Sequence, residues 1–145
     1  MAVITVTAAN VRPLNGAIMR RGTAGASGSV GDAVYLDGTN GWKPADADVE
    51  AASIARGIVV AVNAHVGATT FAVGDRLDIV MFGPVAAGTG MTPGGAIFVS
   101  PTAGKLDQSA SAVQGDYNFR IGWAEAEDIV FVSPATTTAV VSEEE

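Results

Sequence analysis

Alternation of apolar and polar residues is the dominant pattern along this chain. Runs with a two-residue period are found at 2–7, 32–36, 75–82, 95–100, 117–126 and 128–133. They are rich in Val, Ile, Phe and Tyr and are bounded by Gly, Pro, Asn and Asp, which is typical of β-strands. A further run at 56–62 is almost entirely apolar, and we expect it to be a strand buried on both faces. The pattern predicts an all-β fold, a small β-barrel or β-sandwich of about 7–9 short strands.

Helical periodicity is weak throughout the chain. The best window, residues 45–55, has room for a single turn, with Asp46 or Asp48 as its N-cap. We therefore expect little helix.

One strand-and-turn pattern occurs twice in the sequence. Ala33–Leu36 aligns with Ala96–Val99, and Gly41 aligns with Gly104, 63 residues later in both cases. The next apolar run begins near an Arg and a Gly in each copy, and residues 73–83 repeat part of the pattern a third time. Two copies are too few for a solenoid, so we expect one hairpin-based unit to be used more than once in a closed or sandwiched sheet.

The chain divides into three predicted segments. Residues 1–27 are predicted to be an N-terminal arm and loop that can extend over a partner surface; the alternative, an ordinary first strand of the barrel, stays open. Residues 28–133 are the predicted β-barrel or β-sandwich body. Residues 134–145 are Thr-rich and then acidic, and they are predicted to be a mobile tail.

Composition and charge narrow the function. Charged residues are only 16% of the 145 residues, against about 25% in ordinary soluble domains, and 48% are apolar. Such a surface is expected to be covered by another molecule. The net charge is −7, and Arg20–Arg21 is the only adjacent basic pair, so nucleic acid is not expected as a partner.

Other classes of protein are also disfavoured. There is no cysteine, which rules out disulfides and thiolate chemistry. No apolar run approaches the about 20 residues of a membrane span, so no membrane contact is expected. The N-terminal sequence does not resemble a signal peptide, so synthesis without export by a cleavable signal is expected.

The candidates for catalysis or metal binding are weak. His65 is the only histidine and lies in a turn-like segment. The acidic residues that begin at Asp46 do not fit a calcium loop, because Ala51 stands where that loop has its glycine. The Gly-rich stretch 22–32 lacks the phosphate-binding motif. We expect no enzymatic activity, no metal and no cofactor.

The two tryptophans leave two interpretations open. An exposed indole can stack on a sugar, which would make the chain a carbohydrate-binding module. Alternatively, Trp123 belongs to the core and Trp42 anchors a hairpin tip or an interface, where tryptophan is common.

Five stretches of the body resemble a known family of proteins. They are "VGDAVYLDGTNGW", "ARGIVVAV", "VGDRLDIVMFGPVAA", "PGGAIFVSPTAGKLDQSA" and "RIGWAEAEDIVFV", within about residues 28–133. With their strand after a Gly-Asp or Gly-Gly turn and their Gly-containing tip, they are similar to the small capsid cement, or head decoration, proteins of tailed bacteriophages. The resemblance implies a non-enzymatic β protein on the outer surface of the virion capsid, made in the host cytoplasm. It also implies a homotrimer that clamps neighbouring subunits of the major capsid protein.

Several residues are predicted to make subunit or capsid contacts. The apolar ones in the N-terminal segment are Val3, Ile4, Val6, Val11 and Leu14, and the others are Arg12, Arg20, Arg21 and Trp42. The arginines are expected to pair with acidic groups on the capsid. A weak contact with glycans is a further expectation, and another virion, tail or fibre accessory domain is an alternative function.

Overall fold

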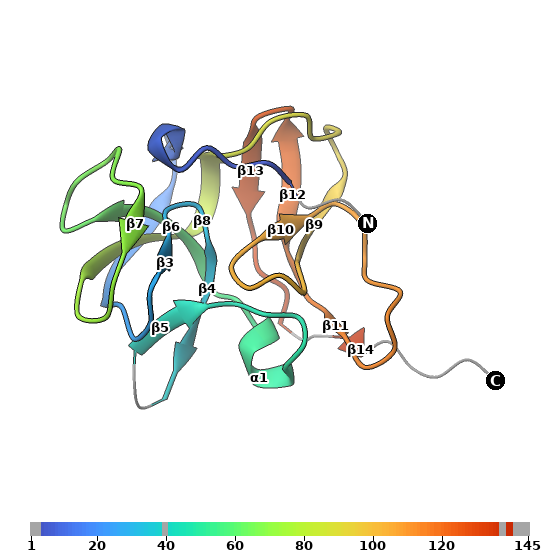
Figure 1. Cartoon of the computed structure of the whole chain (residues 1–145). Coiled ribbons are helices and arrows are strands. Elements are labelled where there is room, and N and C mark those ends of the chain that lie inside the picture. The colour runs from blue at the N-terminus through green and yellow to red at the C-terminus, as the bar shows by residue number, and fades with distance from the viewer. Residues whose placement is uncertain (1–3, 39–40, 137–138, 141–145) are drawn as a thin grey trace.

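The structure, a computed structural model, describes residues 4–38, 41–136 and 139–140. Its main feature is a curled antiparallel sheet that resembles half of a barrel (Figure 1), so the prediction of an all-β fold is confirmed. Helix in the described part of the chain is limited to a 3-10 turn, Ala8–Asn10, and α1, Glu50–Ser53. The single turn within 45–55 is thus confirmed, but Val49 stands at its N-cap position and makes no side-chain cap. The predicted capping role of Asp46 or Asp48 is therefore wrong.

Strand β8 is the longest strand and the centre of the sheet. It spans Arg76–Ala86, 11 residues, and pairs antiparallel with four other strands. The first part of β8 pairs with β6 (Gly57–Val62) and β2 (Ile18–Thr23), and its end pairs with β13 (Ile129–Val132) and β1 (Arg12–Pro13). Because β8 has a partner on each edge along most of its length, most of its backbone hydrogen bonds are made within the sheet.

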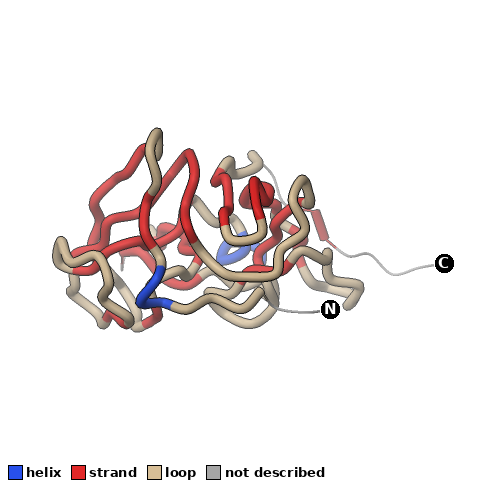
Figure 2. The backbone as a smooth tube through the Cα atoms, turned by 90° about the horizontal axis from the view of Figure 1, so that it is seen from above, coloured by secondary structure: helices blue, strands red, loops and turns tan. Residues whose placement is uncertain are grey.

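The two copies of the sequence repeat occupy equivalent places on either side of the β8–β13 pair. In the first copy, β4 (Ala33–Asp37) forms a hairpin with β5 (Gly41–Pro44) and pairs with β6. In the second copy, β9 (Ala96–Val99) forms a hairpin with β10 (Leu106–Asp107) and pairs with β12 (Arg120–Ala126). The order β10-β9-β12-β13-β8-β6-β4-β5 therefore places the same unit at both ends of the sheet (Figure 1). Seen from above, the backbone is almost entirely strand and loop (Figure 2). The predicted double use of one hairpin-based unit is confirmed.

Two small sheets lie beside the main one. One pairs β3 (Gly28–Ser29) with β7 (Thr70–Phe71), and the other pairs β11 (Tyr117–Asn118) with β14 (Ala139–Val140). The second pair ties part of the predicted mobile tail, 134–145, to the body, whereas Glu143, Glu144 and Glu145 lie outside the described residues.

Residues 4–27 belong to the folded body. The backbone N–H of Ile4 donates to the carbonyl of Leu106 at 2.7 Å, and β1 and β2 both pair with β8. Of the two alternatives for this segment, the structure shows the one that is integrated in the body. The strand predicted at 2–7 is reduced in the described residues to a bridge between Thr5 and Thr89. Strand β2 falls in a stretch that was expected to be a loop.

The core is one apolar cluster that extends over both halves of the sheet. Every residue of β6 is buried, as the apolar run predicts. The largest fully buried side chains of the core include Phe119, Ile121 and Ile58.

A glycine contact joins the two copies of the repeat. The N–H of Ala33 donates to the carbonyl of Gly104 at 3.0 Å, so the turn after β9 packs against the beginning of β4. The φ angle of Gly104 is +79°, and a Cβ at this position would lie 2.5 Å from the Cγ of Asp32. Only glycine satisfies both the backbone angle and the close approach.

We expect Gly104→Ala to lower the free energy of unfolding by about 3 kcal/mol, the sum of left-handed backbone strain and a steric clash. Chemical denaturation measures this loss. The matched control is Gly94→Ala, because Gly94 has a φ of +84° but no atom within 4 Å of its added Cβ. The control should lose only about 1 kcal/mol. Equal losses in the two variants would show that the contact with Asp32 does not matter.

Candidate partner-binding surface

A groove beside β2 brings the adjacent residues Arg20 and Arg21 together with Arg56, which is distant in the sequence. Its volume is about 540 Å³, and it is open to solvent. It is lined by Arg20, Arg21, Leu36, Trp42, Arg56 and Met81, and we call it the arginine groove. Strand β2 supplies the two adjacent arginines and the β4–β5 hairpin supplies the leucine and the tryptophan. Met81 belongs to β8, and Arg56 immediately precedes β6.

The contact between β5 and the end of β2 positions this groove. The chain pairs Ala24 with Trp42 in a parallel bridge, and the N–H of Gly25 donates to the carbonyl of Trp42 at 2.7 Å. The indole of Trp42 lies over Gly22, where any Cβ would collide with it. The glycine in β2 therefore lets the tryptophan pack against the strand, and Trp42 anchors its hairpin as predicted.

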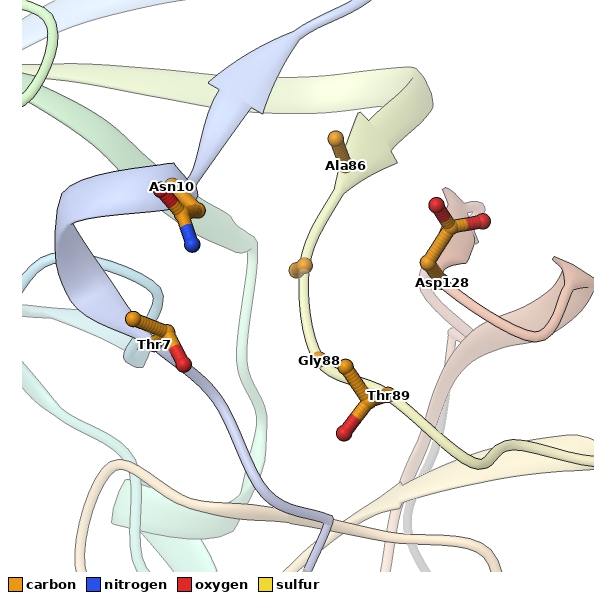
Figure 3. A pocket seen from close by; sticks show the side chains of 7 residues that line it. Thr7, Asn10, Ala86, Gly88, Thr89 and Asp128 are labelled. Atoms are coloured by element: carbon orange, nitrogen blue, oxygen red, sulfur yellow. The ribbon is translucent and has the colours of Figure 1, made fainter.

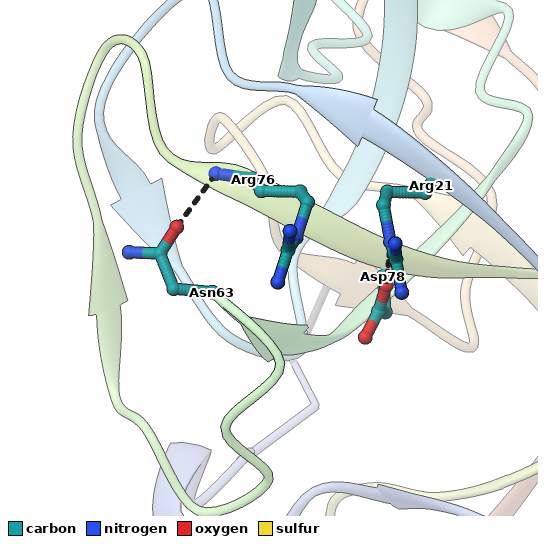
Figure 4. Close-up of polar contacts among 4 residues, drawn as sticks. All are labelled: Arg21, Asn63, Arg76 and Asp78. Atoms are coloured by element: carbon teal, nitrogen blue, oxygen red, sulfur yellow. Dashed lines mark hydrogen bonds and ion pairs between the residues drawn. The ribbon is translucent and has the colours of Figure 1, made fainter.

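The guanidinium groups of the groove are largely unpaired. Nε of Arg21 lies 3.5 Å from Oδ1 of Asp78 on β8, but the arginine side chain is 62% exposed, so this ion pair contributes little (Figure 4). In the part of the chain that the structure describes, the side chains of Arg20 and Arg56 form no ion pair or hydrogen bond. Arginine carries only donors, so the groove suits carboxylate or other acidic groups.

The same figure shows how the loop before β8 is held. The N–H of Arg76 donates to the side-chain oxygen of Asn63 at 3.0 Å (Figure 4). The side-chain amide of Asn63 in turn donates to Asp75 at 3.3 Å. These bonds fix the start of β8, the strand that carries Asp78 and pairs with β2.

A row of apolar side chains crosses four strands next to the groove. Ile18 of β2 pairs with Phe82 of β8, and these side chains are 59% and 46% exposed. The ring of Phe82 meets that of Phe131 edge to face at 5.2 Å, and Phe131 stacks on Trp123 at 5.1 Å. We call these four residues the apolar row. Trp123 is half-buried in this row, so the expectation that it belongs to the core is only partly confirmed.

The apolar row and the arginine groove form one candidate binding surface. They adjoin through β2, where Ile18 of the row and Arg20 of the groove are two residues apart and share a face of the strand. Exposed aromatic side chains next to arginines are characteristic of protein–protein hot spots, and clustered exposed apolar residues mark interaction sites.

The predicted contact residues are distributed between this surface and the core. Arg20, Arg21 and Trp42 come together in the arginine groove. Leu36, Arg56 and Met81 were missed, because only the order of the strands places them beside β2.

The apolar contacts predicted in the N-terminal segment need correction. Ile4 is 8% exposed and Val11 is 0% exposed, so both are core residues because β1 and its approach pack onto the body. Val6 and Leu14 are half-buried, and Arg12 is exposed. Val3 lies outside the described residues.

A second pocket lies between the N-terminal segment and the end of β8. It encloses about 180 Å³ and is lined by Thr7, Asn10, Ala86, Ala87, Gly88, Thr89 and Asp128 (Figure 3). Asp128 is its one ionisable side chain, so the pocket offers no acid–base pair. It has no aromatic residue on which a sugar ring could stack.

The acidic segment before α1 is mostly exposed, as expected for a solvated loop. Slight burial and the neighbouring carboxylates of Asp46 and Asp116 raise the pKa of Asp48. Among the described residues, no group of three or more His, Asp or Glu side chains could hold a metal ion. His65 is exposed in a turn.

Asp32 is a buried charge with a structural partner. Its carboxylate accepts from the N–H of Ser29 at 2.9 Å and from Nζ of Lys105 at 3.4 Å. Burial raises the pKa of Asp32 above 3.8, although Ser29 and Lys105 both act in the opposite direction. Because the pKa is raised on folding, protonation of Asp32 favours the folded state. This contribution to stability is complete below pH 3.8 and is lost as the pH rises through the raised pKa of the folded state.

We expect Lys105→Met to lower the free energy of unfolding by about 1–2 kcal/mol at neutral pH, because the ionised Asp32 then loses its counter-charge. The lysine is 38% exposed, which keeps the loss below that of a fully buried pair. Below pH 3.8 the loss should shrink, since a protonated carboxyl needs no cation. Urea denaturation at both pH values measures it, and a loss independent of pH would contradict the pairing.

No helix in the described part of the chain is long and apolar enough to cross a membrane. Comparison with family models, with curated proteins and with solved structures gives no match.

Proposed function

We propose that this chain is a structural virion protein that binds the outer surface of an assembled bacteriophage capsid. It stabilises the capsid as a cement, or decoration, protein by clamping neighbouring subunits of the major capsid protein. The observation that carries the binding role is the surface on which the apolar row adjoins the arginine groove. The capsid as its partner rests on the resemblance of residues 28–133 to cement proteins.

The chemistry of the surface supports a protein partner with acidic groups. Tryptophan, phenylalanine and arginine are enriched in protein interfaces, whereas Lys and Glu are depleted there. The whole chain has a net charge of −7, yet the groove holds three guanidinium groups. A capsid subunit that presents carboxylates around an apolar patch would complement both parts of the surface.

Stabilisation of the shell follows from mass action. A protein that binds only the assembled shell stabilises it by about 2.7 kcal/mol per site when its concentration exceeds Kd a hundredfold. The chain acts as a homotrimer, so that its second and third contacts form at a high effective concentration. Many such sites on one shell add up to resistance against internal pressure.

Carbohydrate binding is less well supported by this surface. A neutral sugar hydroxyl both donates and accepts hydrogen bonds, but guanidinium groups only donate. One face of the Trp42 indole is also covered by β2 at Gly22, which reduces the area available for stacking.

The direct test is co-sedimentation of the purified chain with phage heads that have been stripped of it, in expanded and in unexpanded form. We expect saturable binding to expanded heads and little to unexpanded ones. Absence of binding to both forms, or binding to a glycan array instead, would contradict the proposal.

The variant Ile18→Glu locates the contact. Ile18 is 59% exposed, so the substitution should leave stability nearly unchanged while it places a charge in the apolar row. We expect binding to the heads to weaken at least about tenfold. The matched control is Val73→Glu, because Val73 is an apolar residue of the loop before β8 and is 71% exposed. If both variants bind equally well, the apolar row is not the contact surface.

A further inference from the structure

The outer edge of β2 is free of strand partners in the described residues. Ile18–Thr23 pairs with β8 along one edge only, while β5 packs against the end of β2 through Trp42 on Gly22 and bridges to Ala24. No other backbone hydrogen bond is recorded for Ile18–Thr23 within the part of the chain that the structure describes. A strand edge of this kind presents unpaired N–H and C=O groups to an incoming chain.

The arginine groove runs beside this free edge. Arg20 belongs to β2, while Leu36 and Trp42 come from the β4–β5 hairpin, which packs against the end of β2 at Gly22. The volume of about 540 Å³ is within the size range of ligand-binding clefts. An extended peptide lying against β2 would therefore have side-chain contacts available on the hairpin side.

We propose that the free edge of β2 accepts an extended, acidic segment of a partner protein as an additional strand. Backbone hydrogen bonds to β2 fix the register of the segment, as in other cases of strand addition. Its carboxylates face the groove and pair with Arg20 and Arg56 beside Trp42 and Leu36, and the apolar residues between them point to the opposite face of the added strand. The inference deepens the proposed function, because it names how the chain would recognise a subunit of the capsid.

The charges of β2 disfavour a second copy of this chain as the added strand. An antiparallel pairing of the middle of β2 with itself brings Arg20 and Arg21 close to the same residues of the other copy. Like charges directly opposite each other destabilise a sheet, and edge arginines or lysines are a common protection against self-association. A segment with Glu or Asp opposite Arg20 and Arg21 stabilises the pairing instead, because the charges then attract.

Alternation defines the sequence of the expected segment. Side chains at successive positions of a strand point to opposite faces, so Arg20 and Arg21 border the groove from opposite faces of β2. Arg21 already lies beside Asp78, whereas the side chain of Arg20 has no partner in the described residues. The segment therefore needs acidic residues at every second position, with apolar residues between them.

The test uses a short capped peptide that alternates Glu and Val, titrated into the full chain by isothermal calorimetry. A peptide that alternates Lys and Val is the charge control. The decisive control is the Glu-Val peptide with alternate backbone nitrogens methylated, which keeps the charges but removes the donors of one edge. We expect only the unmethylated acidic peptide to bind, with at least about tenfold weaker binding to Arg20→Glu and little change with Arg120→Glu. Arg120 is an exposed arginine of β12 in the other half of the sheet.

Three outcomes would overturn the inference. Equal binding of the methylated peptide would mean that side-chain charge alone holds it. Absence of binding of the Glu-Val peptide would mean that the edge accepts no such strand. Self-association of the chain alone, lost in Arg20→Glu, would assign the edge to a second copy. Head binding, and the effect of Ile18→Glu on it, are measured separately. Failure of the peptide test therefore does not contradict the proposed function, which the co-sedimentation experiment tests.

Discussion

The antiparallel pairing of four strands with β8 is the constraint on which the rest of this structure depends. β6 and β13 connect the two copies of the repeat through β8, and β1 and β2 attach the N-terminal segment to it. The apolar cluster extends over both copies because β8 and β13 join them in one sheet. The contact of Gly104 with Asp32, the residue before β4, also holds the two copies of the repeat together.

The candidate binding surface is a consequence of how the N-terminal segment uses β8. Pairing with Arg76–Phe82 places β2 outside the repeated unit, so it has no counterpart in the second copy. This extra strand carries Arg20, Arg21 and Ile18, and it stands next to Phe82 and Trp42. A duplicated body thus gains one surface that is not duplicated, and this is the surface on which we propose that a partner binds.

Much of the fold was predictable because buried strands impose alternation on the sequence. β4, β6, β9, β12 and β13 all lie in runs that the pattern identified, and the repeat predicted their symmetric use. β2 was missed because "IMRRGT" is exposed at most positions, so no buried face imposes a period on it. The arginine groove was not predictable for a related reason: Arg20 and Arg56 are brought together by strand order, which local sequence does not encode. Val11 was assigned to the surface because an apolar residue in a loop-like stretch gives no sign of what covers it.

We propose that a partner protein covers β2 and the adjoining hairpin. Hydrogen exchange, measured by mass spectrometry on the free chain and on the chain bound to expanded heads, tests this contact. We expect slower exchange on binding in peptides that contain Ile18–Thr23 and Leu36, with no change in the loop between β7 and β8. Slower exchange confined to that loop or to the β9–β10 hairpin, with β2 unchanged, would contradict it.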